Sequence, residues 1–158
     1  MKHFVGSATE THIEQIFSIW EAGWHEAHAE IVPPSLRDLR TRASFKERAL
    51  QNVADTYVAV GDDVVLGFCM VKENEVYQMY VSQHARGLGV AQSLMSEAES
   101  RIHSNGHHTA WLACAVGNER AARFYEKSGW VNAGKQVVDL DTSAGTFPLE
   151  VWRFEKSL

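Results

Sequence analysis

The sequence predicts a single α/β domain that spans residues 1–158. Strand-like and helix-like segments alternate in the order β-α-α-β-β-β-α-β-α-β-β along the chain. The composition, with 45% apolar and 22% charged residues, is typical of a globular protein with one sizeable core. The chain has no internal repeat, low-complexity tract or linker that would divide it.

The first 51 residues predict one short strand and two helices. Residues 3–8 are expected to form the strand. A helix capped by Thr9 or Thr11 is expected to follow and to end near residue 22, because apolar residues recur on one face. That face consists of Ile13, Ile16, Phe17 and Trp20. Residues 23–34 are expected to be a loop or broken helix. Two prolines end this segment, and Ser35 is expected to cap a second helix that ends near residue 51.

Three strands and a long helix are expected in the middle of the chain. Two strands are predicted over residues 56–60 and 64–72. The turn residues Gly61-Asp62-Asp63 between them indicate a hairpin. A tight turn then leads into residues 75–81, the expected central strand. The helix is predicted from about Leu88 to Ser104.

The last 50 residues predict a strand, a short helix and a closing hairpin. Residues 109–115 form the strand. Asn118 is a good N-cap for the short helix, and Gly129 is placed where a left-handed residue ends it. Residues 131–140 and 147–155 form the expected hairpin.

The junction between the central strand and the long helix predicts an anion site. It reads Arg86-Gly87-Leu88-Gly89-Val90-Ala91. Glycines let the backbone approach a ligand closely, and the helix start offers unpaired N–H groups and partial positive charge. The usual anion at such a site is a phosphate, and the Arg86 guanidinium adds donors that suit it.

Two common phosphate loops fit this junction poorly. The dinucleotide fingerprint needs a third glycine where the chain has Gln92, and a Walker loop needs a terminal Gly-Lys-Ser/Thr that is absent. A nucleotide-binding oxidoreductase built on Gly87 and Gly89 is therefore a weak alternative.

Two sequence motifs, which follow one another along the chain in the same order as in the family, resemble those of the GCN5-related N-acetyltransferase (GNAT) superfamily. Arg86, Gly89 and Ala91 match its Gln/Arg-x-x-Gly-x-Gly/Ala loop. The segment 118–130 is similar to its later motif, Asn-x-x-Ala-x-x-Phe-Tyr-x-x-x-Gly-Phe/Trp. The resemblance is strong over residues 56–130 and weak over the first 50. It implies the GNAT fold, a central mixed, mostly antiparallel twisted sheet of about seven strands flanked by four helices.

The resemblance implies acetyl-coenzyme A as co-substrate and assigns its contacts. The acetyl group and pantetheine arm are expected along Met79, Tyr80 and Val81. The pyrophosphate is expected on the amides of residues 87–91, and the Asn118 side chain is expected to meet the coenzyme arm. The family uses no metal here, and no cysteine or histidine spacing indicates one.

The resemblance also implies a reaction, N-acetylation of a primary amine by direct attack. Tyr125 is the expected general acid for the departing thiolate, and it also lies against the cofactor. Glu75 is placed where some relatives carry a general base, although an exposed glutamate after a turn needs no function. A non-catalytic acyl-coenzyme A sensor is the alternative function.

The acceptor site is the part that the sequence predicts least. The cluster of Trp24, His25 and His28 lies between the first two helices, a segment that borders the acceptor in the resembled fold. The net charge of −5 favours a cationic acceptor, such as a small polyamine, an aminoglycoside or a peptide amine. Three acidic residues of the last hairpin are candidates to contact it. They are Asp139, Asp141 and Glu150.

Composition excludes several other classes. The acidic balance without a Lys/Arg run argues against nucleic acid as a partner. No apolar stretch is long enough to span a membrane, and the N-terminus lacks a signal-peptide core. Cys69 and Cys114 are expected to be buried reduced thiols, which favours a cytoplasmic protein. A homodimer through the terminal strands is expected by analogy with relatives.

Overall fold

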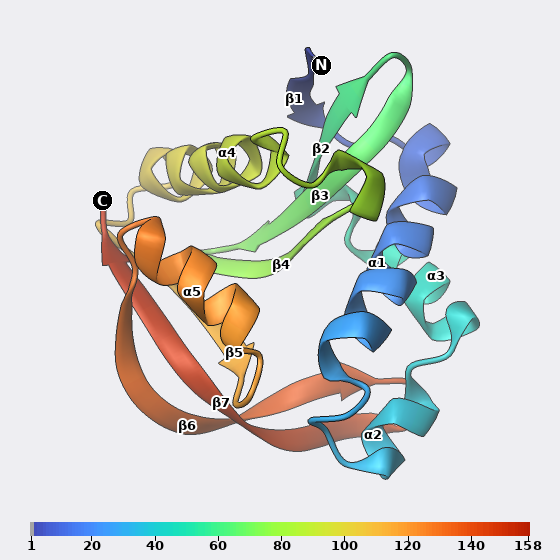
Figure 1. Ribbon diagram of the computed structural model, residues 1–158, viewed down its shortest axis with the longest axis vertical. Coiled ribbons are helices and arrows are strands. Elements are labelled where there is room, and N and C mark those ends of the chain that lie inside the picture. Colours follow the sequence, from blue (N-terminus) through green and yellow to red (C-terminus); the bar gives the residue numbers. More distant parts are fainter. Residues whose placement is uncertain (1) are drawn as a thin grey trace.

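A seven-stranded sheet forms the centre of the molecule in the computed structural model, which describes residues 2–158 (Figure 1). The strands follow the order β1-β2-β3-β4-β5-β7-β6. Only the β4–β5 pair is parallel, so the expected mixed, mostly antiparallel sheet is confirmed. The strand bounds are β1 Phe4–Ser7, β2 Thr56–Gly61, β3 Val64–Lys72, β4 Glu75–Val81, β5 Thr109–Ala115, β6 Val131–Thr142 and β7 Gly145–Ser157.

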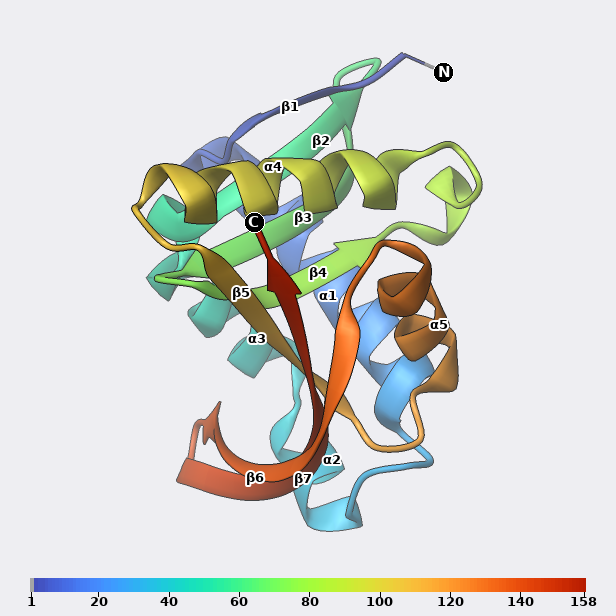
Figure 2. The same ribbon diagram turned by 90° about the vertical axis from the view of Figure 1, so that its left-hand side faces the viewer.

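Helices cover both faces of this sheet. Helices α1 and α3 lie on one face, and α4 lies across the strands on the other (Figures 1 and 2). The helix bounds are α1 Ile13–His28, α2 Pro34–Leu39, α3 Arg42–Gln51, α4 Val90–Ser104 and α5 Glu119–Lys127. Short 3-10 turns over residues 10–12, 53–55 and 83–85 precede α1, β2 and α4.

The two faces hold separate hydrophobic cores. On one face, Leu94 and Ile102 of α4 pack with Cys69 and Phe154 of the sheet, and all four are fully buried. On the other face, α1 and α3 pack on β2 and β3, and the centre of this core consists of Trp20, Phe45 and Phe68. The alternation of strand side chains between the two cores fixes the register of the sheet.

Helix α1 is longer than the sequence predicts. The expected end near residue 22 is wrong, because the helix continues through Gly23 to His28. A Cβ on Gly23 would lie 2.5 Å from Cδ1 of Tyr80, so this glycine makes room for a ring of the central strand and does not end the helix. Trp24 extends the buried face by one turn. The segment expected to be a loop therefore carries Trp24, His25 and His28 on a helix.

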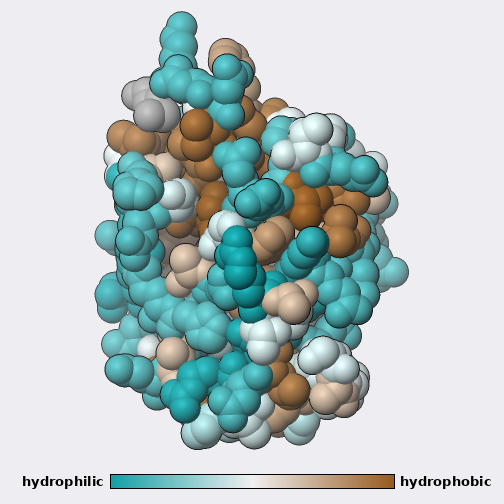
Figure 3. Space-filling model, turned by 90° about the vertical axis from the view of Figure 1, so that its right-hand side faces the viewer, coloured by the Kyte–Doolittle hydropathy of each residue, from teal (hydrophilic) through white to brown (hydrophobic). Residues whose placement is uncertain are grey.

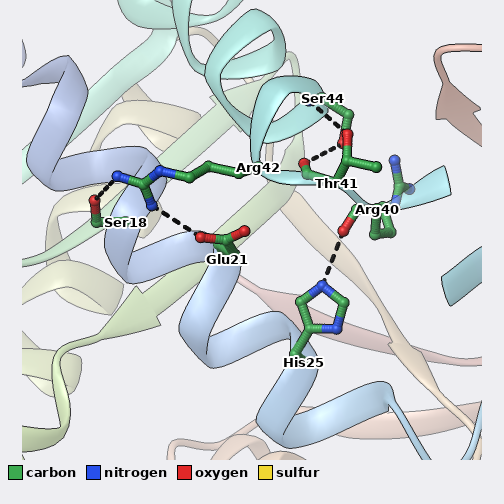
Figure 4. Close-up of polar contacts among 7 residues, drawn as sticks. All are labelled: Ser18, Glu21, His25, Arg40, Thr41, Arg42 and Ser44. Carbon is green, nitrogen blue, oxygen red and sulfur yellow. Dashed lines mark hydrogen bonds and ion pairs between the residues drawn. The ribbon is translucent and has the colours of Figure 1, made fainter. Parts of the chain in front are cut away.

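The second predicted helix is divided, which gives five α-helices in place of the expected four. Helix α2 begins at Pro34 after Pro33, so Ser35 is not its cap. The chain leaves helical geometry at Arg40, and Thr41 starts α3 by accepting a hydrogen bond from the Ser44 amide at 3.2 Å. Figure 4 shows this cap and the neighbouring contacts between α1 and α3. There, Arg42 donates to Glu21 at 2.9 Å and to Ser18 at 3.2 Å.

The outer side of α1 and α3 is polar. Figure 3 shows a largely hydrophilic lower half on this side of the molecule, with hydrophobic groups gathered in the upper half. Within residues 2–158, no helix is long and apolar enough to cross a bilayer.

Several boundaries differ by a few residues from those expected. The hairpin at Asp62 and Asp63 is confirmed, with φ values of 52° and 63°. Helix α4 begins at Val90, two residues later than predicted, because Gly89 adopts the left-handed conformation at its N-cap. The last hairpin is longer than predicted, since β6 runs to Thr142 and β7 begins at Gly145.

Strands β4 and β5 separate almost as soon as they meet. Their only register pair within residues 2–158 is Glu75 with Trp111, and Figure 2 shows the two strands diverging from that point. Strand β4 also carries an extra residue, because Met70 pairs with Gln78 while Val71 pairs with Val76. This bulge lets Tyr77 and Tyr80, three residues apart, both pack on the α1 side.

Candidate active site

The opening between β4 and β5 is a cleft of about 960 Å³. It is lined by α1, β4, the loop before α4, β5, α5 and residues 138–141 of β6. Met79, Val81 and Tyr125 pack against the core on the α4 side, whereas Tyr77 and Tyr80 pack against the core on the α1 side. The cleft therefore joins the two faces of the sheet, so that two reactants can meet in it from opposite sides.

Most residues that the sequence singled out line this cleft. They are Trp24, His28, Glu75, Met79, Tyr80, Val81, Arg86, Gly87, Gly89, Val90, Ala91, Asn118 and Tyr125. Two are outside its lining. Leu88 is exposed on the loop, and the His25 ring donates from Nε2 to the Arg40 carbonyl at 2.8 Å (Figure 4). Of the acidic residues of the hairpin, Asp139 and Asp141 line the cleft and Glu150 does not.

Beyond Glu75, the edge of β4 that faces β5 pairs with no strand of residues 2–158. The main-chain groups of Met79, Tyr80 and Val81 on that edge are therefore free to pair with an extended ligand that carries amides. The side chains at these positions are committed to the two cores, so the backbone is the part available for binding.

The loop that follows β4 has the geometry of an anion site. Gly87 and Gly89 have φ values of +78° and +79°. Within residues 2–158, the amides of Gly87, Leu88 and Gly89 donate to no backbone or side-chain acceptor. A Cβ built on either glycine would meet nothing within 4 Å, so there is open space in front of these amides. The residues present therefore fit a pyrophosphate held at the start of α4.

Arg86 is held at this loop by an acidic residue of α1. Glu26 pairs with Arg86 at 2.9 Å and with Arg120 at 3.4 Å, and it accepts a hydrogen bond from Gln83 at 2.6 Å. The bond from Gln83 and the nearby Arg86 lower the pKa of Glu26. These contacts join α1, the loop and the start of α5 around one side of the cleft.

Asn118 begins α5 as predicted. Its Oδ1 accepts a hydrogen bond from the Ala121 amide at 3.4 Å, and its Nδ2 makes no hydrogen bond within residues 2–158. One half of the side chain therefore caps the helix while the other half is free at the cleft. Gly129 ends the same helix with a φ of +90°, which confirms its expected place.

The sequence was compared with models of known protein families. Residues 13–130 match the model of the acetyltransferase (GNAT) family, which is more than half of the chain. The chain belongs to the GNAT family. It is an N-acetyltransferase, and its acyl donor is acetyl-coenzyme A.

Individual relatives agree with this family. A 5-NmdU N-acetyltransferase of Pseudomonas phage PaMx11 is 26% identical over 123 residues, which is 71% of this chain and 86% of the relative. A GCN5-related N-acetyltransferase structure from Rhodopseudomonas palustris superposes with a TM-score of 0.78 at 18% identity, over 100% of this chain and 97% of that one. The paia N-acetyltransferase of Thermoplasma acidophilum, solved with coenzyme A, gives 0.70 at 19% identity over 100% of both chains.

Tyr125 of this GNAT enzyme is held on α5 by aromatic packing. Its ring centroid lies 5.5 Å from that of Phe154 and 5.8 Å from that of Phe124. Burial raises the pKa of Tyr125, with smaller contributions from Cys114 and Tyr80. Its hydroxyl therefore keeps its proton throughout the neutral range and can donate a hydrogen bond into the cleft.

Glu75 lies at the narrow end of the cleft, where β4 and β5 still pair. Burial raises the pKa of its carboxyl to about 7, although Lys72 and Arg153 act in the opposite direction. A carboxylate with this pKa is divided between its two protonation states at neutral pH, which suits a group that accepts a proton during turnover. Within residues 2–158, no group of three His, Cys, Asp or Glu side chains could hold a metal ion.

The α1 side of the cleft carries the other predicted cluster. His28 stacks on Trp24 with ring centroids 5.1 Å apart, and its Nδ1 donates to the Trp24 carbonyl at 3.0 Å. Burial, with smaller contributions from Arg40 and His25, lowers the pKa of His28 to about 4, although the hydrogen bond to Trp24 acts in the opposite direction. The ring is therefore neutral at pH 7, and its low pKa makes it a weaker proton acceptor than Glu75.

Two buried arginines that the sequence did not predict also line the cleft. Arg40 and Arg48 are 3% and 7% exposed. Arg40 lies in the break between α2 and α3, which the sequence did not predict. For Arg48 a signal exists, since it lies between Phe45 and Ala49 on the buried stripe of α3. A charged residue on an apolar stripe points to a paired or functional group.

The glycine loop provides a direct test of cofactor binding. We expect Gly89→Ala to raise the Kd of acetyl-coenzyme A about 10-fold, because alanine in the left-handed region costs roughly 1–2 kcal/mol and the backbone relaxes away from it. Isothermal titration calorimetry measures the Kd. Gly134→Ala is the matched control, because Gly134 has a φ of +110° and lies on β6 outside the cleft lining. Equal Kd values for both variants and the wild type would contradict the assignment.

Proposed function

We propose that the protein transfers the acetyl group of acetyl-coenzyme A to a primary amine of a small molecule or peptide by direct attack. The observation that carries this proposal is the cleft between β4 and β5, which opens to both faces of the sheet. The phosphate loop and Tyr125 approach the cleft from the α4 side, whereas Trp24 and His28 approach it from the α1 side.

The donor is placed by the backbone in this proposal. The free edge of β4 at residues 79–81 pairs with the amides of the pantetheine arm, and the amides of residues 87–91 hold the pyrophosphate. The free Nδ2 of Asn118 donates to the arm from the other side of the cleft. The thioester supplied by the bound donor then lies between Glu75 and Tyr125, which line the same opening.

The chemistry needs a neutral amine and a proton for the thiolate that departs. Glu75 accepts the proton that the ammonium form of the acceptor must lose. The amine nitrogen then forms its bond to the carbonyl carbon, and the carbon–sulfur bond breaks. The Tyr125 hydroxyl gives its proton to the sulfur, so that the leaving group does not carry an unshielded charge in a partly desolvated cleft. The second proton, which the nitrogen loses as the amide forms, restores the phenol, and Glu75 returns the first proton to solvent.

Cys114 is the one nucleophilic thiol in the lining that residues 2–158 provide, and its environment argues against an acyl-enzyme. Burial raises the pKa of Cys114 to about 12, so very little thiolate is present at neutral pH. We expect no acetylated protein when the enzyme is mixed with acetyl-coenzyme A without acceptor, as measured by intact-mass spectrometry. We also expect Cys114→Ala to keep at least half of the wild-type turnover. An acetyl adduct that disappears when the amine is added would contradict direct attack.

The proposed acceptor is a primary amine of a small molecule or a peptide. The phage relative is named for 5-NmdU, so this compound is one acceptor to test, together with polyamines, aminoglycosides and peptide amines. The acidic residues Asp139 and Asp141 at the edge of the cleft are compatible with the positive charge that a free amine carries.

A further inference from the structure

Two guanidinium groups on the α1 side of the cleft have no carboxylate partner. Within residues 2–158, neither Arg40 nor Arg48 has a carboxylate oxygen within 4.0 Å. Both side chains are more than nine-tenths buried, and both line the cleft. An unpaired charge is costly in such a place, so this part of the cleft favours an anion.

The hydrogen bonds of the two arginines leave several donors unused. Arg40 donates from Nη1 to the Asp141 carbonyl at 2.6 Å, while its Nε and Nη2 donate to no protein acceptor within residues 2–158. Arg48 donates from Nη2 to the Tyr77 hydroxyl at 3.3 Å, and its Nε and Nη1 have no acceptor. The Tyr80 hydroxyl also makes no hydrogen bond and lines the same cleft. Arg40 Nε and Arg48 Nε and Nη1 are thus buried from solvent without an acceptor, so the positive charge of the pair is left uncompensated beside the cleft.

Packing holds these groups in place before any ligand binds. The Arg48 guanidinium lies over the Trp20 ring, 4.3 Å from its centroid, and His25 fixes the backbone of Arg40 by its hydrogen bond to the carbonyl (Figure 4). Tyr77 donates in turn to the Asp141 carboxylate at 3.2 Å. That carboxylate is exposed on β6 and reaches the arginines only through Tyr77 and its own main chain. The cationic pair is therefore preorganised and only partly neutralised.

We propose that Arg40 and Arg48 form the acceptor-recognition subsite and that the amine acetylated by this enzyme carries a carboxylate group, as an amino acid does. The proposal deepens the proposed function and rests on it. A planar guanidinium fork matches a carboxylate, and two forks on one side leave the amine end of the acceptor directed at Glu75 and the donor. The overall acidic charge of the chain pointed to a purely cationic acceptor. Asp139 and Asp141 line the cleft as well, but both are exposed on β6. The two arginines outweigh them because their charges are buried and lack a carboxylate partner.

Matched acceptors provide the first test, because it needs no variant. Thiol release from acetyl-coenzyme A is measured for a set of L-amino acids and for their carboxamides, which differ in the charge of the carboxyl end. Because the carboxylate also raises the pKa of the amine, kcat/KM is expressed per concentration of neutral amine. We expect kcat/KM to be roughly 10- to 100-fold higher for the acids, as charged hydrogen bonds in a desolvated site imply. O-phosphoethanolamine and ethanolamine form a parallel pair that reports on phosphate.

Variants then assign the preference to the two arginines. Arg48→Met and Arg40→Met are expected to reduce the acid-to-amide ratio to near 1, mainly through a higher KM for the acid, while the Kd of acetyl-coenzyme A changes little. Arg48→Lys keeps the charge without the fork and is expected to retain part of the ratio. Arg42→Met is the control, because Arg42 is exposed at the start of α3 and does not line the cleft. Thermal unfolding identifies any variant that fails to fold.

The outcomes separate the two proposals. Three results would overturn the carboxylate assignment without contradicting acetyl transfer. They are equal rates for acids and amides, a preference for polyamines, and a larger preference for O-phosphoethanolamine over ethanolamine than for acids over amides. Absence of thiol release with every amine in the panel counts against the proposed function instead. In that case, calorimetric titration of the amino acids into the protein still tests the subsite, since binding that Arg48→Met abolishes supports it and lack of binding refutes it.

Discussion

Replacing Tyr125 by phenylalanine is expected to lower kcat roughly 100-fold, which is in the usual range for loss of a positioned proton donor. In the proposed mechanism the thiolate leaves from a partly desolvated cleft, and Tyr125, which lines that cleft, supplies the proton. Steady-state thiol release measures kcat. The Kd of acetyl-coenzyme A is expected to stay within about 2-fold, because the ring that packs on Phe124 and Phe154 is retained.

Tyr57→Phe is the matched control for this prediction. Tyr57 lies on β2 outside the cleft lining, with the Arg101 guanidinium 5.0 Å from its ring centroid, so removal of its hydroxyl leaves the cleft unchanged. Wild-type turnover in Tyr125→Phe would remove Tyr125 from the chemistry and leave it a packing role only. A loss confined to cofactor affinity would lead to the same conclusion.

The second large effect is expected at Glu75. Glu75→Gln is expected to lower kcat/KM for the acceptor about 100-fold above pH 8 and much less below pH 6. The carboxyl has a pKa of about 7 in the folded protein, so it is a base only above that value. The ratio of wild-type to variant kcat/KM is measured with one acceptor from pH 5.5 to 9. Ionisation of the acceptor amine affects both enzymes equally, so it does not change this ratio. A ratio that does not change with pH would contradict the role of base.

Stability gives an independent check on the same group. Burial raises the pKa of Glu75 from its ordinary value of 4.5, so its protonated form is favoured by folding. The stability that this provides is fully present below pH 4.5 and is lost as the pH rises through about 7. The Tm of the wild type is therefore expected to fall relative to that of Glu75→Gln over this interval. A Tm difference that is constant with pH would show that the pKa of Glu75 is not raised.

The strand pattern and the two motifs were predictable from sequence for identifiable reasons. The sequence predicts β3, β4 and the hairpin at Asp62 because apolar residues and turn residues there satisfy short-range rules. The left-handed glycines and the Asn118 cap also depend only on neighbouring residues. The cofactor side of the cleft was therefore predictable from residues 75–130 alone. The cytoplasmic location and the homodimer stay predictions.

The acceptor side could not be predicted because tertiary contacts decide it. Gly23 is a helix breaker by propensity, and only the Tyr80 ring packed against it explains why α1 continues. The break at Arg40 depends on a cap by Thr41 that competes with a longer helix. Arg48 lies on α3, Arg40 at the junction of α2 and α3, and Tyr77 at the bulge of β4. These three segments share no sequence pattern, so the sequence gives no sign that the three side chains lie close together.

Acetyl transfer to an amine is tested by amine-dependent thiol release from acetyl-coenzyme A, with the acetylated product identified by mass spectrometry. The panel includes amino acids, carboxamides, polyamines, peptide amines and 5-NmdU, and Tyr125→Phe is assayed in parallel. We expect thiol release that requires an amine, yields the N-acetylated product and falls in Tyr125→Phe. Tight binding of acetyl-coenzyme A without release for any amine would contradict acetyl transfer and would favour a protein that senses acyl-coenzyme A.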